Sequence, residues 1–250
     1  MKQSRCYLNP VLLVLLVSMI LSACGERKTI HIVLEADESN DLSIRPEDMF
    51  VARTIIQKRF AALGMRNAKV LNSGSRQITA DFTLSEKGDP AWVVSAIVQT
   101  GLLEFVEMGS QHPDEGTIIQ TDYLSAATEA PAASSIYHTV MTGSSLATVH
   151  VETGQQLGTT GYAIAFTLNP EATEVFAEYT GNHIGQVLAI VMDKKVISAP
   201  TINAKIEKGS AYIQGSFTEE NATALAILMR YGALPIPVKV TESNVVSPAQ

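Results

Sequence analysis

The residues with the most specific chemistry in this sequence are Leu21-Ser22-Ala23-Cys24. Lys2 and Arg5 come first, an apolar run over residues 11–21 follows, and small residues then precede the cysteine. This order is typical of a secretory signal. The cysteine directly after Leu-Ser-Ala looks like a lipobox, at which a bacterial chain is cut and its new N-terminal cysteine acylated. The sequence therefore predicts a signal over residues 1–23 and lipidation of Cys24.

Two alternatives to lipidation stay open. As a helix, residues 11–22 would span roughly 18 Å, whereas the hydrocarbon core of a bilayer is roughly 30 Å thick. An uncleaved membrane anchor is therefore disfavoured. A plain signal peptide with an incidental cysteine is the other alternative. Lipidation predicts an extracytoplasmic protein, anchored to a bacterial cell membrane by its acyl chains.

Charge and cysteine content narrow the possible partners. The net charge of −7 becomes −9 without residues 1–23, which hold two basic residues and no acidic one. Such a balance argues against nucleic acid as a partner, because nucleic acid needs clustered Lys and Arg. The two cysteines are Cys6 and Cys24, so after cleavage and lipidation none is left for a disulfide.

No catalytic or metal-binding pattern is present in the sequence. The five histidines have no partner histidine three or four positions away. They are His31, His112, His138, His150 and His183. The Gly-x-Ser-x-Gly elbow, the dinucleotide fingerprint and the Walker lysine loop do not occur. The pair Glu219-Glu220 opens an expected helix, where negative charge suits the helix dipole. We therefore expect no enzyme activity, no metal and no cofactor.

The first half of the chain alternates strands with helices. Strands are expected at residues 30–34, 69–71, 78–84 and 102–106, because apolar and polar residues alternate or apolar residues cluster there. Helices are expected after Pro46, up to Gly64, and after Asp89-Pro90, up to Gly101. The resulting order βαββαβ is the ferredoxin-like arrangement. An N-terminal ferredoxin-like subdomain is therefore predicted over residues 24–108.

The rest of the chain divides into three parts. Residues 109–144 are rich in Ser, Thr, Ala, Gly and Pro without periodicity, and predict a flexible linker or loop. Residues 145–241 alternate strands and helices again, as a C-terminal α/β subdomain. Its continuous apolar run at 187–192 predicts a strand covered on both faces. Residues 242–250 are expected to be a loose tail, with polar character starting at Thr241.

Four segments of the second half form a recognisable set: LAIVMDKKVISAP at 188–200, IQGSFT at 213–218, RYGALPIP at 230–237 and FTLN at 166–169. In their order and spacing they resemble the SecD family of protein-export subunits. The match is good over residues 142–240 and looser over 30–107. The resemblance points to the first large extracytoplasmic domain of SecD. It implies an α+β fold with two subdomains of ferredoxin-like, mixed or antiparallel sheets backed by helices: a base and a head.

The residues that carry this resemblance are expected to shape the chain. They are Asp193, Ser198, Ala199, Pro200, Gly215, Phe217, Gly232, Leu234 and Pro235. The sequence departs from the family where Asp193-Lys194-Lys195 replaces Asp-Gly-Lys. Because a two-residue hairpin often needs glycine at positive φ, a looser turn is expected there.

The resemblance implies a role beside the Sec translocon in protein export. We expect a non-enzymatic lipoprotein that binds unfolded or emerging polypeptide through strand edges and an apolar groove between subdomains. We expect no proton-coupling membrane helices of its own. An alternative is a structural or regulatory lipoprotein that docks on another envelope complex. An envelope hydrolase is the least favoured hypothesis.

Overall fold

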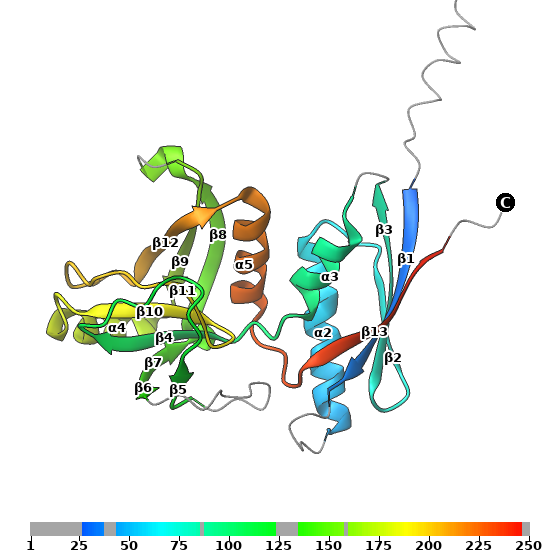
Figure 1. Cartoon of the computed structure of the whole chain (residues 1–250), viewed down its shortest axis with the longest axis horizontal. Coiled ribbons are helices and arrows are strands. Elements are labelled where there is room, and N and C mark those ends of the chain that lie inside the picture. The colour runs from blue at the N-terminus through cyan, green and yellow to red at the C-terminus, as the bar shows by residue number, and fades with distance from the viewer. Residues whose placement is uncertain (1–26, 38–43, 86–87, 124–134, 158–159, 247–250) are drawn as a thin grey trace, which may run out of the picture.

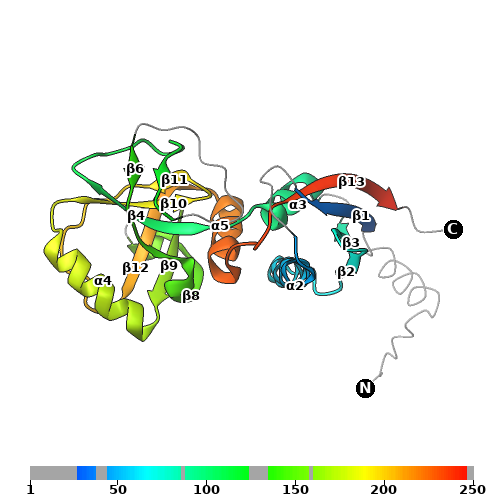
Figure 2. The ribbon, with the colours of Figure 1, turned by 90° about the horizontal axis from the view of Figure 1, so that it is seen from below.

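The computed structural model describes residues 27–37, 44–85, 88–123, 135–157 and 160–246. The proposed signal and Cys24 lie outside the described residues. Figures 1 and 2 show two bodies, each with its own sheets and helices, joined by two chain crossings. We call the body that contains the first strand the base and the other body the head. No described helix is both long and apolar enough to cross a bilayer.

The base is a four-stranded antiparallel sheet with two helices on one face. Its strands run in the order β13-β1-β3-β2. This is the strand order of a ferredoxin-like βαββαβ unit, so the predicted fold class is confirmed. The elements are β1 (Arg27–Ala36), α2 (Pro46–Ala62), β2 (Lys69–Ser73), β3 (Gln77–Ser85), α3 (Pro90–Val98) and β13 (Val238–Val246).

One element of the predicted unit is wrong. The strand expected at residues 102–106 exists as β4 (Leu103–Gly109), but it pairs with β10 and β7 in the head. The sixth element of the base is β13, which pairs antiparallel with β1 from Thr29↔Val246 to Ala36↔Val238. The head is therefore inserted between α3 and β13. The tail predicted to be loose from Thr241 is a strand up to Val246 for the same reason.

The head contains two larger antiparallel sheets and one short parallel pair. The sheets run β11-β10-β4-β7 and β12-β9-β8, and β5 pairs with β6. The strands of the first sheet are β4, β7 (Thr139–Thr142), β10 (Val187–Met192) and β11 (Lys195–Ser198). The others are β5 (Gln120–Thr121), β6 (Ile136–Tyr137), β8 (Leu146–Thr153), β9 (Tyr162–Leu168) and β12 (Ser210–Phe217). The helices are η1 (Gly143–Ser145), η2 (Gly154–Leu157), α4 (Pro170–Asn182) and α5 (Glu219–Tyr231).

Local signals fix where the helices begin. Side-chain oxygens of Asp89, Asn169 and Thr218 accept backbone N–H bonds at the starts of α3, α4 and α5. Each satisfies a donor that has no partner within its own helix. Asp, Asn and Thr are among the residue types preferred at the N-cap position.

The strand β10 is the centre of the head. All six of its residues are buried, as the continuous apolar run predicts. Leu188 and Ile190 pack into the larger head core with the aromatic residues of β4, β9 and α4. Val187 and Ala189 pack into a smaller core on the opposite face of the sheet. Because apolar partners cover both faces, no polar residue alternates along this strand.

The expectation of a structureless segment at 109–144 is wrong in part. Its described residues include β5, β6 and β7, and β7 extends the sheet of β4. These strands have two to four residues each, which is too short for a periodic pattern to show in the sequence.

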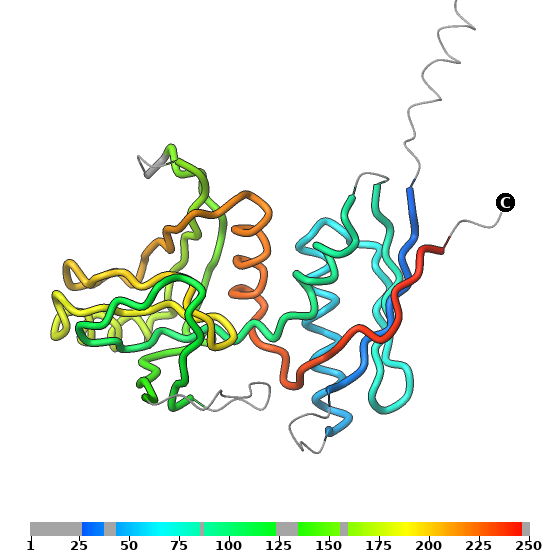
Figure 3. The backbone as a smooth tube through the Cα atoms, in the orientation of Figure 1, coloured from blue at the N-terminus to red at the C-terminus, as the bar shows by residue number. Residues whose placement is uncertain are grey.

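The elements are stacked in layers. Helices α2 and α3 cover one face of the base sheet and contact α5 of the head, so that helices lie between the sheets of the two bodies (Figures 1 and 2). The backbone trace shows the two crossings, one from α3 to β4 and one from α5 to β13, running close together (Figure 3).

Candidate functional site

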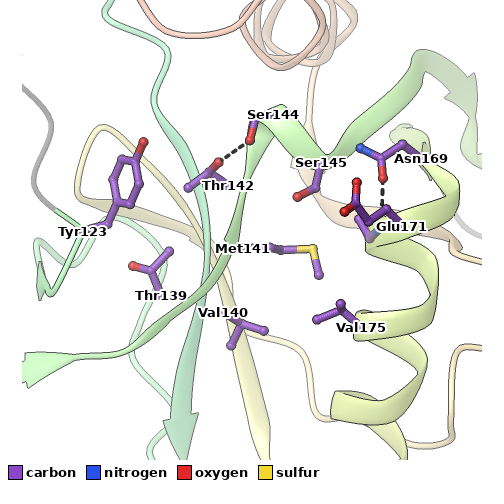
Figure 4. A pocket seen from close by; sticks show the side chains of 11 residues that line it. Tyr123, Thr139, Val140, Met141, Thr142, Ser144, Ser145, Asn169, Glu171 and Val175 are labelled. Atoms are coloured by element: carbon purple, nitrogen blue, oxygen red, sulfur yellow. Dashed lines mark hydrogen bonds between the residues drawn. The ribbon is translucent and has the colours of Figure 1, made fainter.

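A groove of about 480 Å³ lies in the head between β7 and the start of α4. Met141 of β7 and Val175 of α4 face each other across it (Figure 4). The remaining lining is mostly neutral and able to form hydrogen bonds: Tyr123, Thr139, Val140, Thr142, Ser144, Ser145, Asn169, Glu171 and Ala172. An apolar floor with hydroxyl and amide walls suits a ligand that has both apolar side chains and main-chain polar groups.

The strand beside this groove is the edge of its sheet. β7 pairs with β4 and has no further strand on its other side among the described residues. An edge strand presents backbone N–H and C=O groups that can pair with an added strand. The start of α4 is fixed to the same region, because the Asn169 N–H donates to the Ser145 carbonyl at 2.9 Å.

A buried ion pair supports the wall of the groove. Lys194 Nζ lies 2.9 Å from Glu104 Oε2, and Glu104 is fully buried. Lys194 also donates to the Tyr123 carbonyl at 2.7 Å, and Thr139 Oγ1 donates to Glu104 at 2.9 Å. Thr121 completes the cluster through bonds to both charges. Tyr123 and Thr139, which both line the groove, are thus held by one buried cluster.

This cluster also corrects the expectation of a loose turn at Asp193-Lys194. Both residues have positive φ, 50° and 64°, a conformation that is costly for residues other than glycine. The ion pair of Lys194 and the hydrogen bonds of Asp193 hold the turn in place. Lys194, which stands where the family pattern has glycine, thus forms side-chain bonds that a glycine could not form.

A second, more apolar cavity of about 300 Å³ lies beside α4. Its walls include Phe105, Phe166 and Phe176, and the half-exposed Tyr212 also lines it. Val175 of α4 lines the groove, whereas the adjacent Phe176 lines this cavity. This cavity lies within the head, whereas a smaller one of about 210 Å³ lies between Ala62 at the end of α2 in the base and β8 and α5 of the head.

Arg59 of α2 joins the two crossings between base and head. It is fully buried, and its guanidinium donates to the carbonyl of Ile97 in the last turn of α3, where the first crossing begins, and to those of Gln99 and Thr100 in that crossing. It also donates to the Gly232 carbonyl in the second crossing at 2.8 Å. Burial lowers the pKa of Arg59 to about 10, and the nearby charge of Asp193 opposes this shift. The side chain remains charged at neutral pH.

Asp193 fixes the first crossing from the head side. Its carboxylate accepts the N–H groups of Gly101 and Leu102 at 3.0 and 2.8 Å. Burial raises the pKa of Asp193, while the two N–H groups and Arg59 act in the opposite direction. Arg59 and Asp193, with the backbone groups they bind, are called the junction clasp below. Through these side-chain bonds the junction clasp connects the first crossing to the second.

The other family-motif residues lie in the head and in the segment that leaves it. Ser198 Oγ donates to the Gln214 carbonyl at 3.3 Å, and the Pro200 carbonyl accepts the Leu188 N–H. Ala199 packs against the smaller head core. At Gly215 a Cβ would lie 2.9 Å from the Phe217 ring, so a side chain there would collide with it.

The segment after α5 returns the chain to the base. Gly232 ends the helix with φ of 75°. Leu234 is buried in the base core, and its N–H donates to the Thr100 carbonyl at 2.8 Å. Pro235 lies next to it in the crossing. The structure thus places Asp193, Gly232 and Leu234 at one junction but leaves Ser198, Pro200 and Gly215 apart from it.

The histidines are spread over the molecule. His31 bonds Asp81 and His138 bonds Asp122, each at 2.6 Å. Among the described residues there is no group of three or more His, Cys, Asp or Glu side chains that could hold a metal ion.

The groove and Arg59 were not identified as functional from the sequence. About half of the residues that line the groove, from Tyr123 to Ser144, fall in the stretch 109–144 that was assigned to a linker or loop. Arg59 lies in a helix whose sequence shows only an amphipathic pattern. One signal was available in the sequence: Arg59, one residue before Phe60, is a basic residue on the apolar face of α2.

Comparisons with known proteins agree on one family. The family model "SecDF, P1 head subdomain" matches residues 121–236. The protein translocase subunit SecD of Dictyoglomus turgidum is 31% identical over 225 residues, covering 89% of this chain and 48% of that protein. SecDF of Thermus thermophilus is 30% identical over 230 residues, covering 88% of this chain and 30% of that protein. The chain thus spans about half the length, or less, of these relatives.

Two solved structures are similar over most of the chain. A crystal structure of SecDF in a super-membrane-facing form has a TM-score of 0.72 at 26% identity, and covers 94% of this chain and 34% of that one. A structure of SecDF, a membrane component that enhances protein export, has a TM-score of 0.63 at 27% identity. That match covers 85% of this chain and 98% of the other.

Proposed function

Because the chain belongs to the SecD/SecDF P1 domain family, we propose that it binds unfolded polypeptide outside the cytoplasm and assists Sec-type export. It acts without catalysis, as a lipoprotein anchored through Cys24. Its partners are emerging polypeptide, components of the Sec translocon and the membrane that takes its acyl chains. The observation that carries the proposal is the groove beside β7, which is an edge strand among the described strands of its sheet.

The groove suits a ligand of variable sequence. An extended polypeptide added to β7 would bind through main-chain hydrogen bonds, which do not depend on side-chain identity. The neutral hydroxyl and amide groups on the walls can serve further main-chain groups without selecting for charge. The apolar cavity on the other flank of α4 would accept a large apolar side chain of the same client. Unfolded chains expose such side chains, whereas folded proteins bury them.

Main-chain pairing can be tested with peptide chemistry. We would measure the affinity of the full chain for an apolar, unstructured peptide and for the same peptide with alternate backbone amides methylated. Methylation removes N–H donors but leaves the side chains unchanged. We expect affinity to fall by at least about tenfold, which corresponds to about 1.4 kcal/mol. Equal affinity for the two peptides would contradict pairing along β7.

A matched pair of variants tests the location. Val175 is 54% exposed in the groove and Val51 is 44% exposed on α2 of the base. Val175→Asp places a charge against Met141 and should weaken peptide binding. Val51→Asp makes the same change on another helix and should not. Loss of binding in both variants, or in neither, would contradict a site in the groove.

A further inference from the structure

The start of β1 and the end of β13 lie side by side at one end of the base sheet. Val246 is the register partner of Thr29, and Val245 is the partner of Ile30. The first described residues, Arg27 and Lys28, pair with the end of β3. This end of the base lies on the side of the molecule away from the head (Figures 1 and 3).

The surface at this end combines exposed aliphatic and basic side chains. Val245 is 61% exposed and Val246 is 47% exposed. Arg27 is exposed and Lys28 is half-buried, and neither forms an ion pair with any residue that the structure describes. We call these four residues the sheet-end patch. Exposed aliphatic groups beside cations match the boundary between lipid headgroups and acyl chains.

The short segment between Cys24 and β1 indicates that a membrane is what contacts this patch. Cys24 lies three residues before Arg27. Three residues span at most about 11 Å when fully extended. Acyl chains attached to Cys24 and inserted in a bilayer would therefore keep the sheet-end patch within reach of the headgroups.

We infer that the sheet-end patch is a membrane-contact surface that fixes the orientation of the protein on the bilayer. The inference rests on the proposed lipidation of Cys24, but it is independent of polypeptide binding. The head, on the far side of α2 and α3, projects away from the lipid. Its groove then faces the aqueous compartment, where an emerging polypeptide is available.

The orientation can be measured by lipid quenching of single labels. The acylated chain has no other thiol, because its remaining cysteine is Cys24, so Val246→Cys introduces one labelling site. Ile184→Cys is the matched control, since Ile184 is 58% exposed and follows α4 in the head. Each labelled protein would be placed in vesicles of phosphatidylethanolamine and phosphatidylglycerol that carry a headgroup nitroxide. We expect several-fold stronger quenching at residue 246 than at residue 184.

A charge reversal tests the role of the patch itself. Arg27→Glu with Lys28→Glu should reduce quenching at residue 246 several-fold in the acylated protein. Lys58→Glu with Lys69→Glu makes the same charge change elsewhere on the base and should have no effect. Equal quenching at residues 246 and 184 in an acylated chain would overturn the contact surface and leave the anchor standing. An intact mass without acyl chains would overturn both, whereas peptide affinity in solution tests the groove separately.

Discussion

Removal of the Arg59 side chain should uncouple the base from the head. In Arg59→Met the four hydrogen bonds to the two crossings are lost, while the aliphatic part of the side chain is replaced. Both bodies keep their own cores, because the described cores of base and head are separate clusters. The change therefore acts mainly on the junction clasp.

The expected magnitude follows from two opposing terms. Hydrogen bonds to a charged group contribute about 1.5–3 kcal/mol each, so the four bonds of Arg59 contribute at least about 6 kcal/mol. Burial lowers the pKa of Arg59 from 12.5 to about 10, which corresponds to a cost of about 3 kcal/mol at about 1.36 kcal/mol for each tenfold change. The difference predicts that Arg59→Met lowers the free energy of unfolding by about 3 kcal/mol.

The assay is urea unfolding followed by two probes. The single tryptophan, Trp92, lies in α3 and packs against the base core, so its fluorescence reports on the base. Far-ultraviolet circular dichroism reports on both bodies. We expect coincident transitions in the unmodified protein and separate transitions in Arg59→Met, because coincidence is the test of a single cooperative unit.

Lys58→Met is the matched control for this experiment. Lys58 precedes Arg59 on α2 but is exposed, so the same chemical change should alter the free energy of unfolding by less than about 0.5 kcal/mol. The reasoning is refuted if Arg59→Met changes it by less than about 1 kcal/mol and the two transitions remain coincident.

Three further predictions concern the residues around the groove and the clasp. Lys194→Met leaves Glu104 buried without its cation and should lower the free energy of unfolding by about 3–5 kcal/mol. In urea unfolding, the double variant Lys194→Met with Glu104→Gln should lose clearly less stability than Lys194→Met alone. An equally large loss in the double variant would contradict a buried pair. Gly101→Ala should be more destabilising than Gly74→Ala in thermal melts. Both glycines have positive φ, but only at Gly101 would the added Cβ lie 2.7 Å from the Arg59 side chain. Equal losses of thermal stability in the two variants would count against the junction clasp. Burial raises the pKa of Asp193, so ionisation of this carboxyl disfavours the folded state. The stabilising contribution of Asp193 is therefore largest at pH values below its ordinary pKa. It is lost as the pH rises through the raised pKa. The stability of the unmodified protein relative to Asp193→Asn should therefore increase as pH falls from 7 towards about 4, and the opposite trend in urea titrations would contradict the assignment.

The periodicity of apolar residues, together with capping residues, glycines and prolines, was sufficient to predict most elements of the fold. Asp89, Asn169 and Thr218 cap helices as their residue types indicate, and residues 187–192 form a strand buried on both faces. These features depend on neighbours in the sequence, so local patterns reveal them. The family resemblance correctly indicated a base and a head.

Features that depend on distant pairing could not be predicted in the same way. Nothing local in residues 238–246 shows that they pair with β1, more than 200 positions earlier. The insertion of the head between α3 and β13 was missed for that reason. The groove was missed because β7 is short and because Glu104 and Lys194, the ion pair that supports the groove wall, are 90 positions apart.

Photo-crosslinking in living cells tests the central claim most directly. A benzoylphenylalanine would replace Val175 in the groove or, as the control, Val51 on α2, while export of a secreted protein is in progress. The account predicts crosslinks from residue 175 to unfolded, exported polypeptides and none from residue 51. Crosslinks from residue 175 to a single folded envelope protein, or to no polypeptide at all, would contradict it.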